Sequence, residues 1–180
     1  MGRSSFEGKS QIKEWLKDLD IQHNKVLDIG AGAGTYPALY RDTLKDCKWV
    51  GVEIWEPYKE KYGSERHYDT LLIGDARVMQ FNYYDVCFLG DVLEHMTKEE
   101  AVSLVKKLKN SCTYIIISIP IIKYPHDSEH GNPYQAHIKD DWSHKEVMET
   151  FSGVQKFWTG QKIGVYLISV SYTHLRAHET

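Results

Sequence analysis

Acidic residues stand near the ends of several apolar segments in this chain of 180 residues. Asp28 leads into the glycine-rich loop Gly30-Ala31-Gly32-Ala33-Gly34, and Glu53 lies at the end of the next apolar segment. Glycine has no Cβ, so this loop is able to turn sharply and let a ligand approach the backbone closely. A carboxylate in the position of Glu53 is able to accept hydrogen bonds from both hydroxyls of a ribose. The loop and the carboxylate together predict a site for an adenosine-containing cofactor.

Two cofactor classes use such a site, and the residues around the loop separate them. The dinucleotide fingerprint has a third glycine or alanine at the position that Thr35 occupies here. A carboxylate such as Asp28 would also repel a pyrophosphate, whereas it would attract the ammonium group of an amino acid. We therefore favour a cofactor with a cationic end near Asp28. An NAD(P)-dependent oxidoreductase stays as one alternative, and a binding module that keeps the cofactor fold without turnover is the other.

Hydrophobic periodicity predicts the elements that position these residues. Helical spacing predicts an amphipathic helix over 11–19 and another that starts near Tyr36. Apolar, β-branched runs predict strands at 25–29, 49–54, 70–73, 84–89 and 114–119. Strands that alternate with helices indicate βαβ units, and therefore a parallel sheet buried on both faces.

The second half of the chain adds two helices and a hairpin. Thr97 with Glu100, and Ser143 with Glu146, form two capping boxes at which helices are predicted to start. Two further strands are predicted at 154–158 and 163–170. The connection between them is too short for a parallel crossover, so they should pair antiparallel.

Four successive motifs resemble those of class I S-adenosylmethionine-dependent methyltransferases, especially the small-molecule enzymes of the ubiquinone-biosynthesis type. The motifs are Asp28-x-Gly30-x-Gly32-x-Gly34, Glu53, Gly74-Asp75-Ala76 and Asp91-Val92-Leu93-Glu94-His95. The resemblance covers residues 26–170. It implies an α/β, Rossmann-like, doubly wound sheet of seven strands in the order 3-2-1-4-5-7-6, with only strand 7 antiparallel.

The resemblance also implies a cofactor and its ligands. The cofactor would be S-adenosyl-L-methionine, with S-adenosyl-L-homocysteine (SAH) as its product, and the acceptor an oxygen, nitrogen or carbon nucleophile of a small molecule. Asp28 and the loop would hold the methionine part, Glu53 the ribose, and Asp75 the adenine amino group. The cofactor-binding residues implied in this way are Asp28, Gly30, Ala31, Gly32, Gly34, Glu53, Ile54, Trp55, Asp75, Ala76, Asp91 and Val92.

Histidines are the candidates for a general base, because imidazole titrates near working pH. His95 is the first candidate, with His130 and His137 behind it, and packing before the Thr97 helix is an equal alternative for His95. The segment 121–141 is expected to be a substrate-facing loop. Its prolines make a helix improbable there, so we expect no metal site at its polar cluster of His126, Asp127, Glu129, His130 and His137.

Composition narrows the remaining function classes. The formal net charge of -3 argues against a surface that binds duplex nucleic acid. No stretch approaches the ~20 apolar residues that span a bilayer, and the first ten residues lack the apolar core of a secretion signal. We expect a cytoplasmic protein with a single domain over residues 1–170. Its first 24 residues would be a helix and lead-in, and residues 171–180 fit no predicted element.

Overall fold

The computed structural model describes residues 5–128 and 131–170 of the chain. Its strands are β1 (Lys25–Ile29), β2 (Lys48–Glu53), β3 (Thr70–Ile73), β4 (Tyr84–Gly90), β5 (Cys112–Pro120), β6 (Val154–Thr159) and β7 (Ile163–Ser169). Its helices are α1 (Lys9–Lys17), α2 (Thr35–Tyr40), α3 (Pro57–Tyr62), α4 (Lys98–Leu108) and α5 (His144–Thr150). Three short 3-10 turns complete the elements: η1 (Ser64–Arg66), η2 (Leu93–His95) and η3 (Pro133–Gln135).

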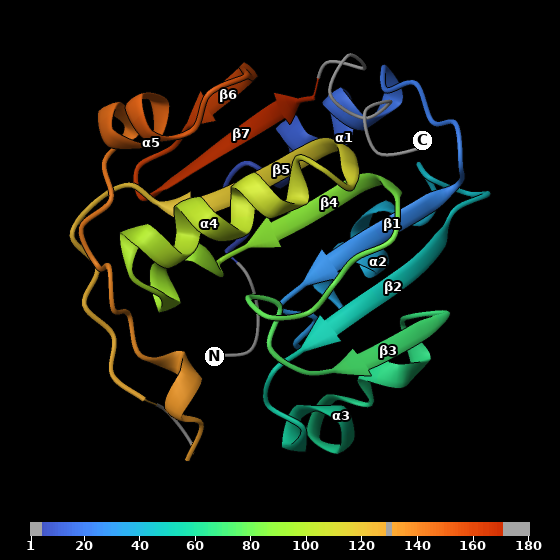
Figure 1. The fold of residues 1–180 in the computed structure, drawn as a ribbon, viewed down its shortest axis with the longest axis horizontal. Helices are drawn as coiled ribbons and strands as arrows, with labels where there is room; N and C mark the ends of the chain where they lie inside the picture. The colour runs from blue at the N-terminus through green and yellow to red at the C-terminus, as the bar shows by residue number, and fades with distance from the viewer. Residues whose placement is uncertain (1–4, 129–130, 171–180) are drawn as a thin grey trace.

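All seven strands join one sheet in the order β3-β2-β1-β4-β5-β7-β6 (Figure 1). The pairs β2·β3, β1·β2, β1·β4 and β4·β5 are parallel, whereas β7 is antiparallel to both β5 and β6. This is the Rossmann-like order that the resemblance implied, so the predicted fold class is confirmed. Strands β2 and β3 extend the sheet on one side of β1, and β4 and the later strands extend it on the other side. The order of the strands therefore reverses at β1.

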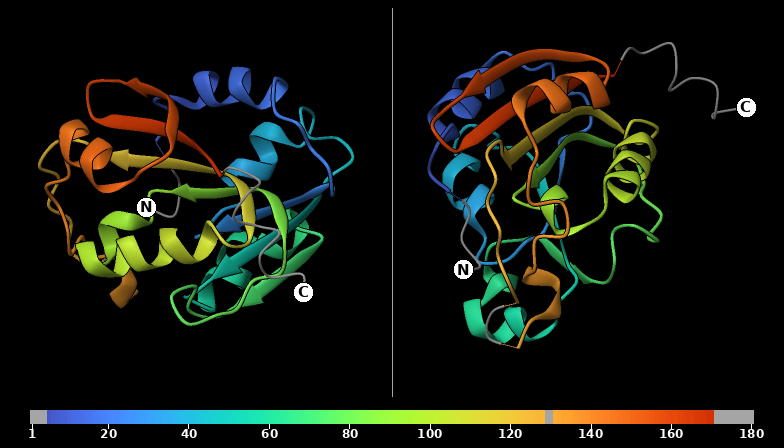
Figure 2. Two further views of the ribbon diagram at one scale, coloured as in Figure 1. Left: turned by 45° about the horizontal axis from the view of Figure 1, so that its top comes forward. Right: turned by 90° about the vertical axis from the view of Figure 1, so that its left-hand side faces the viewer.

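Helices cover both faces of the sheet, as the side view in Figure 2 shows. Alternate residues of β4 point to opposite faces, since side chains in a strand have a period of two. Leu89 packs in a buried cluster with Leu104 of α4, whereas Phe88 packs on the other face with Trp15 of α1 and Tyr40 of α2. The continuous apolar run of β4 therefore fills two cores at once.

The ends of the helices largely follow the predicted caps. Thr97 and Glu100 form the predicted capping box at the start of α4. At α5 only half of the box forms: the Ser143 hydroxyl accepts from the Glu146 N–H at 3.1 Å. The Glu146 carboxylate was expected to return this bond, but it binds Lys98 at 2.8 Å instead. The first helix begins at Lys9 rather than at residue 11, after Gly8 in a left-handed conformation.

The amino end of β4 is closed by a buried acid. The Asp85 carboxylate is fully buried and accepts backbone N–H bonds from Gln22, His23 and Lys25 at 2.8 to 3.2 Å. These bonds hold the connection between α1 and β1 against the sheet. Satisfying three backbone donors with one carboxylate fixes this edge of the molecule without any ligand.

Two further expectations concern the whole chain. Among the described residues, no helix is long and apolar enough to cross a bilayer. The described residues share one sheet, and a single domain over residues 1–170 stays a prediction. Residues 171–180, for which no element was predicted, lie outside the described residues, as do residues 1–4.

Candidate active site

A cavity of about 350 Å³ opens at the carboxyl ends of the parallel strands. Its walls come from the loops after β1, β2, β3 and β4 and from the segment that joins β5 to α5. In Figure 1 this segment runs along the carboxyl edge of the sheet. Ligands of open α/β sheets bind at such a reversal point, and the size is within the range of small-molecule sites, ~300–1,000 Å³.

The glycine loop after β1 forms the floor of the cavity. Gly30, Gly32 and Gly34 have φ angles of 79°, 44° and 71°, a left-handed conformation that residues with a Cβ rarely adopt. A Cβ on Gly30 would also lie 2.7 Å from the Val92 side chain. Gly30, Ala31 and Gly32 line the cavity, as predicted for the loop. Gly34 does not line it, and its role is to begin α2 as the N-cap residue.

Glu53 ties the end of β2 to this loop. Its Oε2 accepts from the Gly32 N–H at 2.9 Å, and its Oε1 accepts from the Trp55 N–H at 2.8 Å. Burial raises the pKa of this carboxyl, against the lowering effect of the backbone donors. The residue lines the cavity, so oxygen lone pairs that the backbone does not use are available to a ligand hydroxyl.

Asp28 lies behind the loop rather than in the cavity wall. The residue is buried, and Tyr68 donates its hydroxyl to Asp28 Oδ2 at 2.6 Å. Burial raises the pKa of the Asp28 carboxyl to about 8. The sequence predicted contact with the cofactor, but Asp28 is not among the lining residues of the cavity. Any effect of Asp28 on a ligand therefore acts through the loop.

Asp75 lines the cavity, but its carboxylate is already engaged. Arg77 donates Nε to Asp75 Oδ1 at 3.0 Å and Nη2 to Oδ2 at 2.8 Å, and the Arg77 backbone N–H donates to Oδ1 at 2.9 Å. These bonds lower the pKa of the Asp75 carboxyl. The Asp75 carboxylate thus caps the turn that follows β3, and an adenine amino group would have to share oxygens that Arg77 occupies.

The two predicted adenine-packing residues differ in position. Ile54 lines the cavity together with Ala76, whereas Trp55 does not line it. The Trp55 ring instead lies 6.2 Å from the ring of Tyr134, measured between centroids. Tyr134 belongs to η3, so this contact is the point at which the long segment after β5 approaches the end of β2.

The other part of the cavity is polar and follows β4. Asp91, Val92, Glu94 and His95 line it from one side, and His137 lines it from the other. Asp91 has a left-handed φ of 54°, and its Oδ2 accepts from the Ser5 N–H at 3.1 Å. We call this region, defined by Asp91, Glu94, His95 and His137, the acceptor part of the cavity.

Two of the three predicted base candidates meet in the acceptor part. The rings of His95 and His137 lie 4.9 Å apart between centroids. Burial lowers the pKa of His95 to about 4 and also lowers the pKa of His137, so both rings are neutral at pH 7. His130, the third candidate, lies outside the described residues.

Two buried charged residues lie beside the acceptor part, and the sequence analysis predicted no role for either of them. Glu94 is 2% exposed, and burial together with the neighbouring Asp91 raises its pKa well above the usual value. Lys9 of α1 is 5% exposed; its Nζ donates to the Tyr36 hydroxyl at 2.7 Å, and burial lowers its pKa. Lys9 precedes the helix predicted over 11–19, so no signal in the sequence pointed to it.

Comparison with known proteins agrees with this geometry. Residues 27–112 match the family model described as a methyltransferase domain. These residues run from β1 to the start of β5 and contain the whole glycine loop, Glu53, Asp75 and the motif after β4. Among curated proteins, no sequence matches the chain.

Solved structures share the fold at low sequence identity. A candidate O-methyltransferase from Nostoc punctiforme PCC 73102 is 19% identical with a TM-score of 0.62, covering 88% of this chain and 55% of its own. The N-terminal domain of EvdMO1 with SAH bound is 13% identical with a TM-score of 0.67, covering 93% and 83%. Coclaurine N-methyltransferase, bound to N-methylheliamine and SAH, is 18% identical with a TM-score of 0.62, covering 86% and 51%. The chain thus spans about half the length of the first and third of these proteins.

Proposed function

We propose that this chain is a class I S-adenosylmethionine-dependent methyltransferase that acts on a small molecule. The observation that carries the proposal is the shared cavity at the sheet reversal, in which the glycine loop, Glu53 and the residues after β3 and β4 meet. The match of residues 27–112 to a methyltransferase domain supports it. So does SAH in two structures of the same fold. The finer likeness to ubiquinone-biosynthesis enzymes stays a prediction.

In the proposed complex, the loop Gly30 to Gly32 holds the methionine part, and Glu53 accepts from the ribose hydroxyls. Ile54 and Ala76 lie against the adenine, and Asp91 and Val92 lie near the sulfonium. All of these residues line the cavity. Asp28 lies behind the loop and accepts from the Tyr68 hydroxyl, which also lies 3.1 Å from the Ala31 carbonyl oxygen of the loop.

For methyl transfer, the main task of the protein is to align the acceptor with the methyl group. The sulfonium supplies the activated methyl group, so the chain has to place a nucleophile in line behind the methyl carbon and exclude water. The acceptor part of the cavity adjoins the proposed sulfonium position through Asp91 and Val92. Its polar side chains suit an acceptor that carries a hydroxyl or amino group.

Titration calorimetry with SAH and NADH tests the cofactor class. We expect SAH to bind and NADH not to bind, because the third fingerprint position is Thr35. Glu53→Ala removes a charge-assisted hydrogen bond of about 1.5–3 kcal/mol, so SAH should bind about 10- to 150-fold more weakly. Glu56→Ala is the matched control, since Glu56 is exposed and does not line the cavity. NADH binding, or equal SAH affinity in both variants, would refute the proposal.

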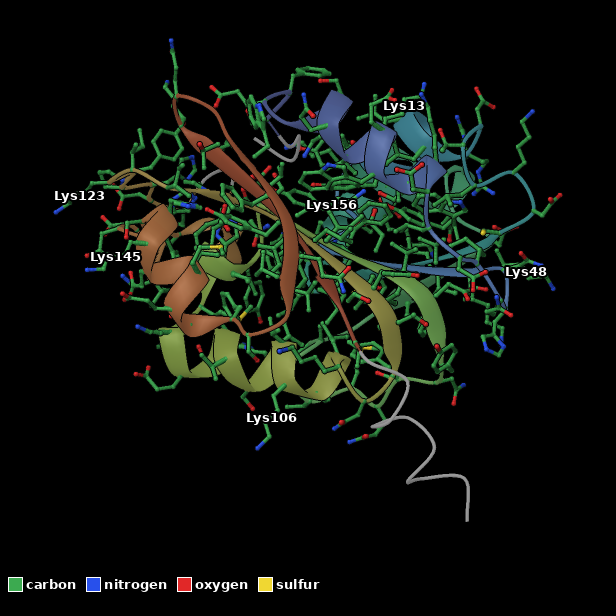
Figure 3. The ribbon with its side chains drawn as sticks, turned by 90° about the horizontal axis from the view of Figure 1, so that it is seen from above. Lys13, Lys48, Lys106, Lys123, Lys145 and Lys156 are labelled. Carbon is green, nitrogen blue, oxygen red and sulfur yellow. The ribbon has the colours of Figure 1, made fainter. Side chains whose placement is uncertain are left out.

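The expectation that nucleic acid is not a substrate agrees with the distribution of lysines. Figure 3 labels Lys13, Lys48, Lys106, Lys123, Lys145 and Lys156, which lie on different elements around the molecule rather than on one surface. Nucleic-acid surfaces gather such residues on one face. A small acceptor accordingly remains part of the proposal, and a cytoplasmic location stays a prediction.

A further inference from the structure

Three side chains in the acceptor part of the cavity offer the ligand atoms of a metal site. One ligand atom from each of Glu94, His95 and His137 lies within 4.8 Å of the other two. An ion holds such ligands ~2.0–2.2 Å away, so ligand atoms around a tetrahedral ion are ~3.4 Å apart. The three ligand atoms would therefore have to approach one another by up to about 1.4 Å to share one ion.

The hydrogen bonds of the two imidazoles leave suitable atoms for coordination. Nδ1 of His95 donates to the Ala136 carbonyl at 3.1 Å, and Nδ1 of His137 donates to the Tyr124 carbonyl at 2.6 Å. A carbonyl oxygen only accepts, so each neutral ring has its proton on Nδ1 and a lone pair on Nε2. Metal-binding histidines commonly donate their other N–H to such a carbonyl, which fixes the tautomer and the orientation of the ring.

Glu94 provides an independent observation. Its side chain is 98% buried and lines the cavity, yet among the described residues its Oε2 has no hydrogen-bond partner. Burying a carboxylate oxygen without a partner costs free energy. A cation between Glu94 and the two imidazoles would satisfy this oxygen and remove that cost.

We propose that Glu94, His95 and His137 bind one divalent first-row transition metal ion. Two imidazoles and one carboxylate suit such an ion, whereas Mg²⁺ and Ca²⁺ prefer oxygen ligands throughout. Three protein ligands leave coordination positions open toward the cavity. The sequence predicted no metal site, and the polar cluster within 121–141 that it argued against includes His137. The other two ligands, Glu94 and His95, come from η2, outside that segment.

The role of the ion rests on the proposed function and narrows the acceptor to an alcohol or a phenol. A hydroxyl oxygen at an open position would lose its proton more readily, and the proton would pass to water at the cavity mouth. This oxygen would form a bond to the methyl carbon while the bond between carbon and sulfur breaks. The products would be a methyl ether and SAH.

Calorimetric titration of the untagged full chain with Zn²⁺, Mn²⁺ and Co²⁺ tests the site, with the Co²⁺ absorption spectrum as a second readout. We expect one ion per chain and ligand-field bands of Co²⁺ bound to nitrogen. Glu94→Gln and His137→Gln should each weaken binding by about 100-fold or more, since each removes a ligand. Glu14→Gln and His23→Gln are matched controls on exposed residues away from the cavity, and their affinity should equal that of the parent chain.

SAH titration of the same samples separates this inference from the proposed function and reports folding of each variant. If SAH binds and no ion binds, or if Glu94→Gln and His137→Gln retain the parent affinity for the ion, the metal site is refuted and the methyltransferase proposal stands. If the ion binds as expected and SAH does not bind, the proposed cofactor class is refuted and the metal site stands.

Discussion

Two buried carboxylates stand near opposite ends of strand β4, and they differ in what satisfies them. Asp85, near the amino end, accepts backbone N–H bonds from Gln22, His23 and Lys25. Glu94, beyond the carboxyl end, is buried to a similar degree, yet its Oε2 has no hydrogen-bond partner among the described residues. The amino end of the strand is therefore complete in the protein alone, whereas at the carboxyl end the described residues leave one buried carboxylate oxygen without a partner.

The largest effect should come from the amino end. Asp85→Ala leaves three backbone donors without their acceptor, and each such group costs about 1–3 kcal/mol when buried. We expect the free energy of unfolding to fall by about 3 kcal/mol or more, measured by urea denaturation. Asp85→Asn keeps one acceptor oxygen and should lose less. A loss below about 1 kcal/mol in Asp85→Ala would mean that this end is not held by the carboxylate.

At the carboxyl end, His95→Gln should affect turnover rather than folding. We expect SAH formation with an alcohol or phenol acceptor to fall by about 100-fold, because the imidazole lone pair in the acceptor part is lost. Affinity for SAH, measured by calorimetry, should be unchanged. His23→Gln is the control at the opposite end of the sheet. Equal turnover in the two variants would assign His95 to packing, the alternative that the sequence left open.

Asp75→Asn compares the two carboxylates, Asp75 and Glu53, that line the part of the cavity proposed to bind the cofactor. Because Arg77 already occupies both oxygens of Asp75, the loss to a cofactor should be that of a weak, shared hydrogen bond. We expect SAH affinity to fall by less than about 10-fold, against about 10- to 150-fold for Glu53→Ala. A larger loss at Asp75 would show that binding displaces Arg77 and frees the carboxylate.

The smallest effect should come from Glu94→Gln in the metal-free protein. The amide has the same shape and removes a buried carboxylate oxygen that lacks a partner, so the free energy of unfolding should stay constant or rise by about 1 kcal/mol. Urea denaturation with a chelator present measures this change. A loss of about 2 kcal/mol or more would place Glu94 in the same structural class as Asp85.

The sequence predicted the fold because local and long-range signals agreed. The apolar runs predicted all seven strands, and the short connection at 159–162 correctly required β6 and β7 to be antiparallel to each other. Helix α4 was predicted equally well, because its capping box and its buried positions are close in sequence. Small errors lay where a side chain had a stronger partner elsewhere, as with Glu146 and Lys98.

The site was harder to predict from the sequence, because its details depend on contacts between residues that are distant in the chain. Glu53 and the loop were placed correctly in one cavity, but nothing in the sequence places Tyr68 against Asp28. Likewise, a motif gives the order of Glu94 and His95 but not their distance to His137, which depends on how the segment after β5 returns across the sheet. Residues on separate elements meet only through the tertiary fold.

The hydrogen bond from Ser5 to Asp91 has a practical consequence for protein engineering. Ser5 itself lines the cavity, so the amino end of the described residues adjoins the site. An affinity handle or reporter fused there would compete with small molecules for entry. Fusions are better attached after β7, whose last residue, Ser169, pairs with Tyr114 of β5 away from the cavity.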